Sequence, residues 1–237
     1  MLKVVKDLNI YSKNNKEVLI STQNILEAIN ITNAKIFSLK VKTEKEAINI
    51  FDAIDFRMLS GMLGEALITI INKSNPNLEK NPHIDGYPDL VDVSSIDNLS
   101  FFSSPFISDT IRSRFNNYKF GGIEIKNTFG VKSSGRKLEK GDTRLGNINK
   151  KLDWKAHHTN TNYLLGIFSD FIDGTPQIVA AFYSDKLTSL DWKTKQNPKI
   201  DSAMTSFSTI ERTGWEKMKS NMLICIDKQE YLDFFQG

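Results

Sequence analysis

Cysteine is nearly absent from the 237-residue sequence, which contains only Cys225. A single cysteine excludes an intramolecular disulfide framework, and it excludes zinc or iron–sulfur sites built from several cysteines. It is typical of proteins of the reducing cytoplasm, where we expect this chain to act. Cys225 lies in the apolar run 222–226, so we interpret it as a buried hydrophobic side chain and not as a nucleophile.

Long apolar runs are also missing. No stretch is long enough to cross a bilayer, so we expect no membrane-spanning segment and no membrane partner. The N-terminal residues alternate Lys and Asn with apolar residues, and they lack the apolar core of a signal peptide. With 40% hydrophobic and 10% aromatic residues the chain can bury a sizeable core, which excludes wholesale disorder. The remaining classes are an intracellular enzyme and an intracellular binding protein.

The net charge is small, +3 from 31 basic and 28 acidic residues, but it is unevenly distributed. Residues 131–160 contain eight basic against three acidic residues, which is +5, so the rest of the chain sums to −2. The same stretch contains three glycines and few large apolar residues, which is typical of a loop. Such a basic loop is a candidate for contacting phosphates, and the alternative is a solvated surface loop.

The hydrophobic patterns predict an α/β protein with a mixed central β-sheet flanked by helices. The expected helices are residues 17–31, 43–71 with a break near 60–61, 152–160 and 209–220, and the expected strands are 90–94, 120–129, 163–172, 177–183 and 222–226. Thr43 and Glu46 form a possible capping box at the start of the second helix. No linker is evident, so we expect a single domain, 1–237. Within it, 1–58 is expected to be a helical N-terminal part and 59–237 the core.

The most informative residues are in Pro88-Asp89 and in Glu124-Ile125-Lys126. Residues two apart in a strand share a face, so Glu124 and Lys126 are expected to point the same way while Ile123 and Ile125 point into a core. Burial of an acid and a lysine on a sheet has a high desolvation cost, so we expect such a pair to serve a function. If the strand that follows Asp89 neighbours this one, Asp89 and Glu124 converge.

Two converging carboxylates are hard oxygen ligands that suit Mg²⁺, which keeps several waters and accepts further oxygens from phosphate. Lys126 would then lie beside the metal-bound water or the phosphate. These are the groups needed to hydrolyse a phosphodiester. The alternative is a surface ion pair between Glu124 and Lys126, with Asp89 capping a turn.

On Pro88-Asp89 and Glu124-Ile125-Lys126 the chain resembles the PD-(D/E)XK nuclease superfamily, and within it the type II restriction endonucleases. The resemblance implies a mixed sheet flanked by helices and a Mg²⁺-dependent endonuclease acting on double-stranded DNA. It implies that Asp89 and Glu124 bind the metal and that Lys126 assists the attacking water. Glu65, in the helix before the first core strand, resembles the additional acid that many members carry. The alternative for Glu65 is a solvent-facing helix residue.

Asp85 and Asp92 are the rival acids near Asp89. Asp92 lies three residues further along the same expected strand and so shares no face with Asp89, whereas Asp85 can approach from the preceding loop.

The basic stretch directly follows the expected active strand, so we expect it to lie against the DNA. Arginine suits guanine and asparagine suits adenine by bidentate geometry. His157 and His158, adjacent on an expected helix, point in different directions and are poorly placed to share a metal, so DNA or surface roles are favoured for them. The candidate DNA contacts are Lys132, Ser134, Arg136, Lys137, Arg144, Asn147, Asn149, Lys155, His157 and Asn160.

A type II enzyme usually matches a palindromic site with its own two-fold symmetry, so we expect a homodimer, with residues 1–58 as dimer interface or DNA clamp. Two alternatives stay open. One is a repair or junction-resolving nuclease of the same superfamily, and the other is a DNA-binding protein without catalysis.

Overall fold

The computed structural model describes residues 1–13, 17–105, 110–133, 139–156, 162–195 and 206–236. Within them, seven strands form one mixed sheet in the order β1-β11-β9-β8-β6-β5-β4. Their bounds are β1 (Leu2–Val4), β4 (Leu78–Lys80), β5 (Leu90–Asp92), β6 (Gly122–Thr128), β8 (Leu164–Ile172), β9 (Thr175–Ser184) and β11 (Met222–Ile226). β6 and β8 are parallel, and the other neighbours in the sheet are antiparallel. Two-stranded sheets pair β2 (Asn9–Tyr11) with β3 (Val18–Ser21) and β7 (Lys155–Ala156) with β10 (Ser208–Thr209).

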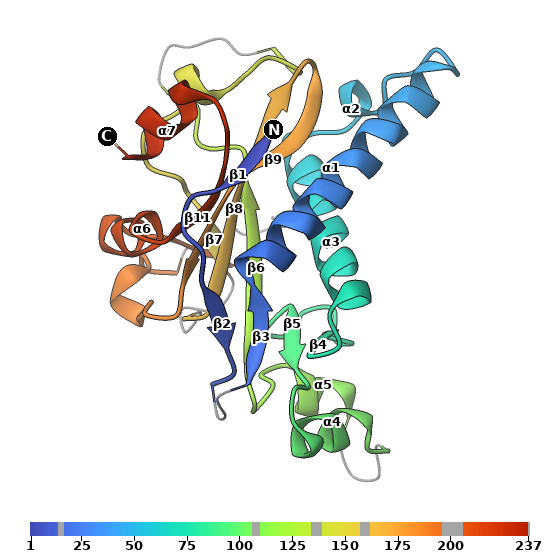
Figure 1. Ribbon diagram of the computed structural model, residues 1–237, viewed down its shortest axis with the longest axis vertical. Helices are drawn as coiled ribbons and strands as arrows, with labels where there is room; N and C mark the ends of the chain where they lie inside the picture. The colour runs from blue at the N-terminus through green and yellow to red at the C-terminus, as the bar shows by residue number, and fades with distance from the viewer. Residues whose placement is uncertain (14–16, 106–109, 134–138, 157–161, 196–205, 237) are drawn as a thin grey trace.

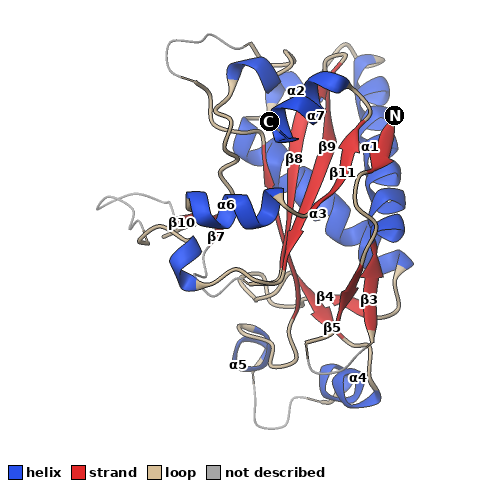
Figure 2. Cartoon of the chain, turned by 60° about the vertical axis from the view of Figure 1, so that its left-hand side comes forward, coloured by secondary structure: helices blue, strands red, loops and turns tan. Residues whose placement is uncertain are grey.

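Helices flank this sheet, which confirms the predicted α/β class. Figure 1 shows α1 (Thr22–Glu44) and α3 (Phe56–Ser74) on one side and α6 (Arg212–Lys219) and α7 (Gln229–Gln236) on the other. The shorter elements are α2 (Ile50–Ala53), α4 (Ile96–Ser103), α5 (Ile111–Phe115), η1 (Leu145–Asn147) and η2 (Ser189–Asp191). Figure 2, turned by 60°, shows the same long sheet from another side. None of the helices in the described part of the chain is long and apolar enough to cross a membrane.

The helix α3 carries one wall of the candidate site. Asp55 caps its N-terminus by accepting hydrogen bonds from the backbone N–H groups of Arg57 and Met58. Leu59, Leu63, Leu67 and Ile71 recur every four residues and are fully or almost fully buried, so this stripe of α3 packs on the sheet. Glu65, on the opposite face of the helix, is exposed.

The strand β6 carries another wall. Ile123 and Ile125 belong to the core cluster beneath α1 and α3, as the alternating pattern predicted. Asn127 joins three elements: its side-chain amide donates to the Ser60 carbonyl of α3 (3.1 Å), and its side-chain oxygen accepts from the Ser169 hydroxyl of β8 (2.8 Å). The Ser60 hydroxyl in turn donates to the Asn127 carbonyl (3.0 Å). These bonds hold α3 against the strand that carries Glu124 and Lys126.

Between β5 and β6, the described residues 93–105 and 110–121 form an insertion that contains α4 and α5 (Figure 1, lower part). It has an aromatic core of its own, in which the rings of Phe115 and Tyr118 stack with centroids 5.6 Å apart. The Asn81 side chain donates to the Phe115 carbonyl (3.0 Å) and to the Pro88 carbonyl (2.9 Å). The insertion therefore supports the loop that presents Asp89.

Several predicted element boundaries are wrong. The helix expected from residue 17 starts only at Thr22, because the consecutive apolar residues 18–20 form β3 and Ser21 caps α1. Thr43 does not open a helix: its hydroxyl donates to the Leu39 carbonyl in the last turn of α1. No break occurs at 60–61, and the chain leaves the helical conformation instead at Ile54 and Asp55, between α2 and α3.

Two larger regions also differ from expectation. Residues 1–58 are not simply helical, because β1 pairs with β11 at an edge of the main sheet. Of the expected helix 152–160, the described residues 152–156 are not helical, and Lys155–Ala156 form β7. Leu152, Trp154 and Ala156 are fully buried there, which is the two-residue period of a strand.

Candidate active site

Asp89 directly precedes β5, and the antiparallel pairing of β5 with β6 brings it close to Glu124. The Asp89 backbone N–H donates to Glu124 Oε2 (3.1 Å). Asp89 Oδ2 accepts from the Ile125 backbone N–H (2.8 Å) and from Lys126 Nζ (3.1 Å). The predicted convergence of the two carboxylates is thus present, and it is fixed by backbone as well as side-chain bonds.

Glu124 and Lys126 point the same way from β6, as the strand period predicted. Lys126 Nζ lies 2.6 Å from Glu124 Oε1, so one ammonium group bridges both carboxylates. The Glu124 side chain is only 4% exposed, whereas Lys126 and Asp89 retain 21% and 22% exposure. A ligand therefore reaches the cluster from the side of Lys126 and Asp89.

Burial shifts the ionisation of this cluster. Desolvation raises the pKa of Glu124 from 4.5 to about 7, because the cost of burying its charge exceeds the attraction of Lys126. The pKa of Lys126 is raised as well, since attraction by Glu124 and Asp89 outweighs the effect of its own burial. With all three groups ionised, two negative charges face one positive charge, and a further cation would be attracted.

The donor set fits a hard divalent cation such as Mg²⁺. Two carboxylates converge, and among the described residues no group donates to Asp89 Oδ1. No cluster of three or more His, Cys, Asp or Glu suited to a metal occurs in the described part of the chain. Asp89 and Glu124 would thus supply two ligands and leave the others to water and phosphate, which is the coordination that Mg²⁺ commonly has in proteins.

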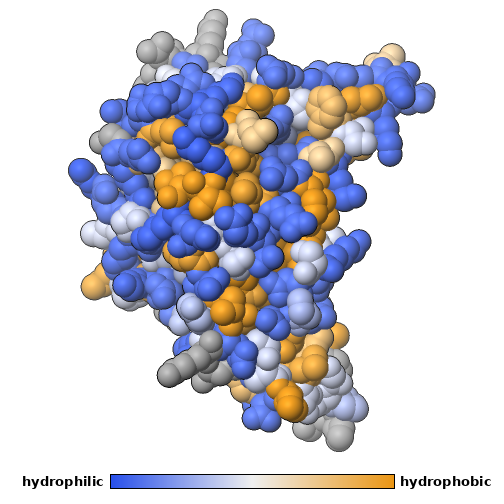
Figure 3. Space-filling view, in the orientation of Figure 1, coloured by the Kyte–Doolittle hydropathy of each residue, from blue (hydrophilic) through white to orange (hydrophobic). Residues whose placement is uncertain are grey.

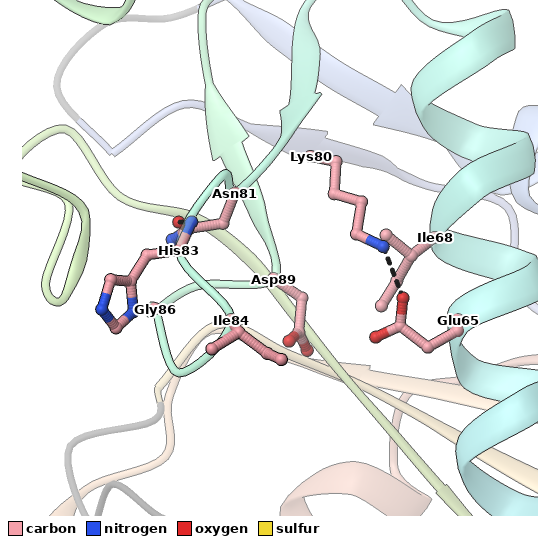
Figure 4. Close-up of a pocket in the computed structure, with 8 residues that line it drawn as sticks. All are labelled: Glu65, Ile68, Lys80, Asn81, His83, Ile84, Gly86 and Asp89. Atoms are coloured by element: carbon pink, nitrogen blue, oxygen red, sulfur yellow. Dashed lines mark hydrogen bonds and ion pairs between the residues drawn. The ribbon is translucent and has the colours of Figure 1, made fainter. Parts of the chain in front are cut away.

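Glu65, on α3, lines a cleft together with Asp89, but its carboxylate is paired with a lysine outside the central cluster. Its Oε2 lies 2.6 Å from Lys80 Nζ at the end of β4. Figure 4 shows this pair opposite Asp89, with His83 and Ile84 on the far side of a cleft of about 370 Å³. Glu65 and Asp89 also line a second, smaller hollow together with Lys126 and Asn127. The predicted acid is therefore at the site, although it does not form a three-acid cluster with Asp89 and Glu124 in this arrangement.

The rival acids lie differently. Asp92 is fully buried and accepts hydrogen bonds from the Ser12 hydroxyl and from the Ser94 hydroxyl and backbone N–H. It is thus committed to the protein interior. Asp85 is exposed in the loop before β5, where its backbone N–H donates to His83 Nδ1 (3.1 Å).

Arg144 is the clearest disagreement with the expected DNA contacts. Its side chain is buried, and Nε donates to the Phe129 carbonyl (2.7 Å) while the guanidinium lies over the Phe56 ring, 4.5 Å from the centroid. Its backbone N–H donates to buried Asp170 (2.6 Å). These contacts hold the loop to the core, so the structure argues against base reading by Arg144.

The other expected DNA contacts divide into two groups. Lys132, Asn149 and Lys155 are exposed and Asn147 is half-buried, so these four are accessible. Ser134, Arg136, Lys137, His157 and Asn160 lie outside the described residues. The roles of both groups remain predictions.

Sequence reasoning did not find Lys80 or the positioning role of Asn127. Lys80 reaches the site because β4 pairs with β5 in the register Lys80 to Leu90, one residue from Asp89. Its strand is three residues long, too short for a clear periodic pattern. Nothing in the sequence around Asn127 indicates a positioning role, because its contacts are with α3 and β8, which are distant in sequence.

Comparison of the chain with protein-family models, with curated proteins and with solved structures finds no match.

Proposed function

We propose that the protein is a magnesium-dependent endodeoxyribonuclease that cuts double-stranded DNA at specific sites, as type II restriction enzymes do. The observation that carries this proposal is the meeting of Asp89, Glu124 and Lys126 at the paired strands β5 and β6. The same residues carry the resemblance to the PD-(D/E)XK nucleases. A surface ion pair with a turn-capping aspartate accounts less well for Glu124, whose carboxylate is almost fully buried.

Each residue has a distinct task in this proposal. Asp89 and Glu124 would hold Mg²⁺, which when bound lowers the pKa of a coordinated water and neutralises charge on the phosphate. Lys126 orients the attacking water and donates a hydrogen bond to the charge that develops on the phosphate. The bonds from the Ile125 and Asp89 backbone keep the two carboxylates in place before substrate arrives.

The partners follow from the same proposal. Lys132, Asn149 and Lys155 offer accessible groups for phosphates and base edges on the stretch that leaves β6. We also propose a homodimer, with Phe37 of α1 and Ile48 of the turn after it, both more than half exposed, at the interface between the two copies. We place this activity in the cytoplasm, where DNA is accessible to a restriction enzyme.

Substitution of Lys126 tests the proposal. Incubation of wild-type protein with unmethylated phage DNA and Mg²⁺ is expected to give discrete fragments. Lys126→Ala should reduce the cleavage rate by at least about 100-fold, because it removes a preorganised charge at the phosphate. Asp89→Asn should do the same, since it removes one of the two charged ligands.

The control is Lys73→Ala, which changes an exposed lysine in the last turn of α3. Normal cleavage by Lys126→Ala would contradict the assigned active site. Intact DNA after incubation with wild type on several substrates would contradict site-specific cleavage. Preference for branched over linear duplex would favour a repair or junction nuclease, and tight binding without cleavage in Mg²⁺ or Mn²⁺ would favour a non-catalytic binding protein.

A further inference from the structure

A second lysine, Lys80, faces the candidate active site from the opposite wall. It ends β4, whose neighbour β5 begins directly after Asp89. The Asn81 backbone N–H donates to the Asp89 carbonyl (2.9 Å), which ties the lysine-bearing strand to the active-site loop. Figure 4 shows the Lys80 ammonium and the Glu65 carboxylate meeting across from Asp89. Lys80 therefore lies within the cleft that a substrate would enter.

Lys80, which lines this cleft, and Lys126, which lines the smaller hollow next to it, differ in how firmly they are held. Lys126 is 21% exposed and is shared by two carboxylates, so its position is fixed. Lys80 is 47% exposed and its partner Glu65 is 60% exposed. An ion pair between such accessible groups contributes little to stability, because water competes well for both charges. Lys80 can thus exchange Glu65 for another anion at small cost.

The cleft needs a cation on this side if it is to accept a polyanion. Asp89 and Glu65 both line it, and carboxylates repel phosphate. Lys126 is committed to the carboxylates at the reacting centre. Lys80 is the lysine that lines the cleft on the α3 side, and Asn81 and His83 add polar groups beside it.

We propose that Lys80 binds a DNA backbone phosphate next to the one that is cleaved, and that it leaves Glu65 to do so. This inference rests on the proposed nuclease function and extends it by a substrate-positioning residue. The exchange also frees the Glu65 carboxylate, which lines the same cleft as Asp89. Phosphate contacts of this kind fix the register of a protein on DNA and carry no sequence information.

The salt dependence of DNA binding measures this contact. A fluorescent random-sequence duplex is titrated with full-length wild type, Lys80→Met and Lys73→Met over a range of KCl concentrations, with Ca²⁺ replacing Mg²⁺ and the duplex verified as uncut. Loss of one phosphate contact should reduce the slope of log K against log salt by about 0.9. Lys80→Met is expected to show this reduction, whereas Lys73→Met should keep the wild-type slope. Lys80→Arg should restore the slope, because it retains the charge.

Glu65→Gln gives an independent measurement. Removing its charge releases Lys80, so this variant is expected to bind the duplex more tightly than wild type. The double variant Glu65→Gln/Lys80→Met should lose most of that gain. A role for Lys80 that is only structural would change the thermal midpoint of the protein without changing the slope.

The outcomes separate the two proposals. If wild type binds and cuts DNA but Lys80→Met keeps the full slope, the phosphate contact is wrong and the nuclease stands. If Lys80→Met loses the slope but Lys80→Arg does not restore it, the loss reflects altered structure and the inference fails. If wild type neither binds nor cuts duplex DNA, the proposed function fails, and the role of Lys80 with it.

Discussion

Glu124 holds a carboxylate where water has almost no access, and this placement governs its ionisation. Its pKa in the folded protein, about 7, lies above the ordinary value of 4.5. The folded state therefore binds more protons than the unfolded state between these two values. Its contribution to stability is greatest below about pH 4.5 and is lost as the pH rises through 7.

This sign leads to a pH prediction. In EDTA, the free energy of unfolding of wild type should fall by about 3 kcal/mol from this group between about pH 4.5 and 8. Glu124→Gln should remove that component, because an amide does not titrate. Urea denaturation at several pH values measures both. Glu46→Gln, which changes an exposed carboxyl after α1, serves as control.

A pH dependence in Glu124→Gln as steep as that of wild type would contradict the assignment. Divalent cations are expected to oppose the effect in wild type, because a metal favours the deprotonated carboxylate.

At the scale of elements, the site depends on the pairing of β5 with β6. Leu90 lies opposite Ile123, and Val91 lies opposite Gly122. Gly122 has a φ of +145°, and a Cβ built on it would lie 2.0 Å from the Leu90 carbonyl oxygen. Only glycine allows the two strands to approach this closely. The convergence of Asp89 with Glu124 thus requires a residue that has no side chain.

Gly122→Ala is therefore expected to separate the strands. The free energy of unfolding should fall by more than about 2 kcal/mol, since both the backbone conformation and the contact are strained. DNA cleavage should be lost even where the protein remains folded, because Asp89 no longer reaches Glu124. Gly146→Ala is the matched control, as a Cβ there has no neighbour within 4 Å. Equal urea midpoints for Gly122→Ala and wild type would show that the strands tolerate a methyl group.

At the scale of the whole molecule, α1 extends beyond the sheet. Figure 1 shows its C-terminal part projecting from the body, and Figure 3 shows hydrophobic surface along this part of the molecule. Phe37 is 54% exposed and Ile48, in the turn beyond the helix, is 56% exposed. In the proposed homodimer, these exposed apolar side chains would lie at the interface with a second copy of the chain.

Phe37→Glu is expected to convert a dimer into a monomer, because two glutamates would face each other or apolar groups across a two-fold interface. Light scattering coupled to size-exclusion chromatography measures the mass. Leu190→Glu, which changes an exposed leucine of η2, tests whether any new surface charge has this effect. A monomeric wild type, or a Phe37→Glu protein that stays dimeric, would contradict an interface on α1.

Local pattern in the sequence was enough for the core strands and for the central pair of the site. The strands 163–172 and 177–183 are confirmed to within a few residues, because they are continuous apolar runs separated by a turn. Glu124 and Lys126 share a face because side chains alternate along any strand. The alternation Leu152, Trp154, Ala156 was equally local but was missed, because five residues also fit a helix.

Tertiary structure alone decided which distant residues meet. Arg144 resembles its basic neighbours in the sequence, yet it is buried because Asp170 and the Phe129 carbonyl accept its hydrogen bonds. Lys80 reaches Glu65 because β4 pairs with β5, and strands this short have no periodic pattern from which the pairing could be predicted. Residue type and strand period determine what a side chain can do and which way it points. Its partners depend on which distant segments of the chain pack against each other, and the residues next to it in the sequence do not specify that.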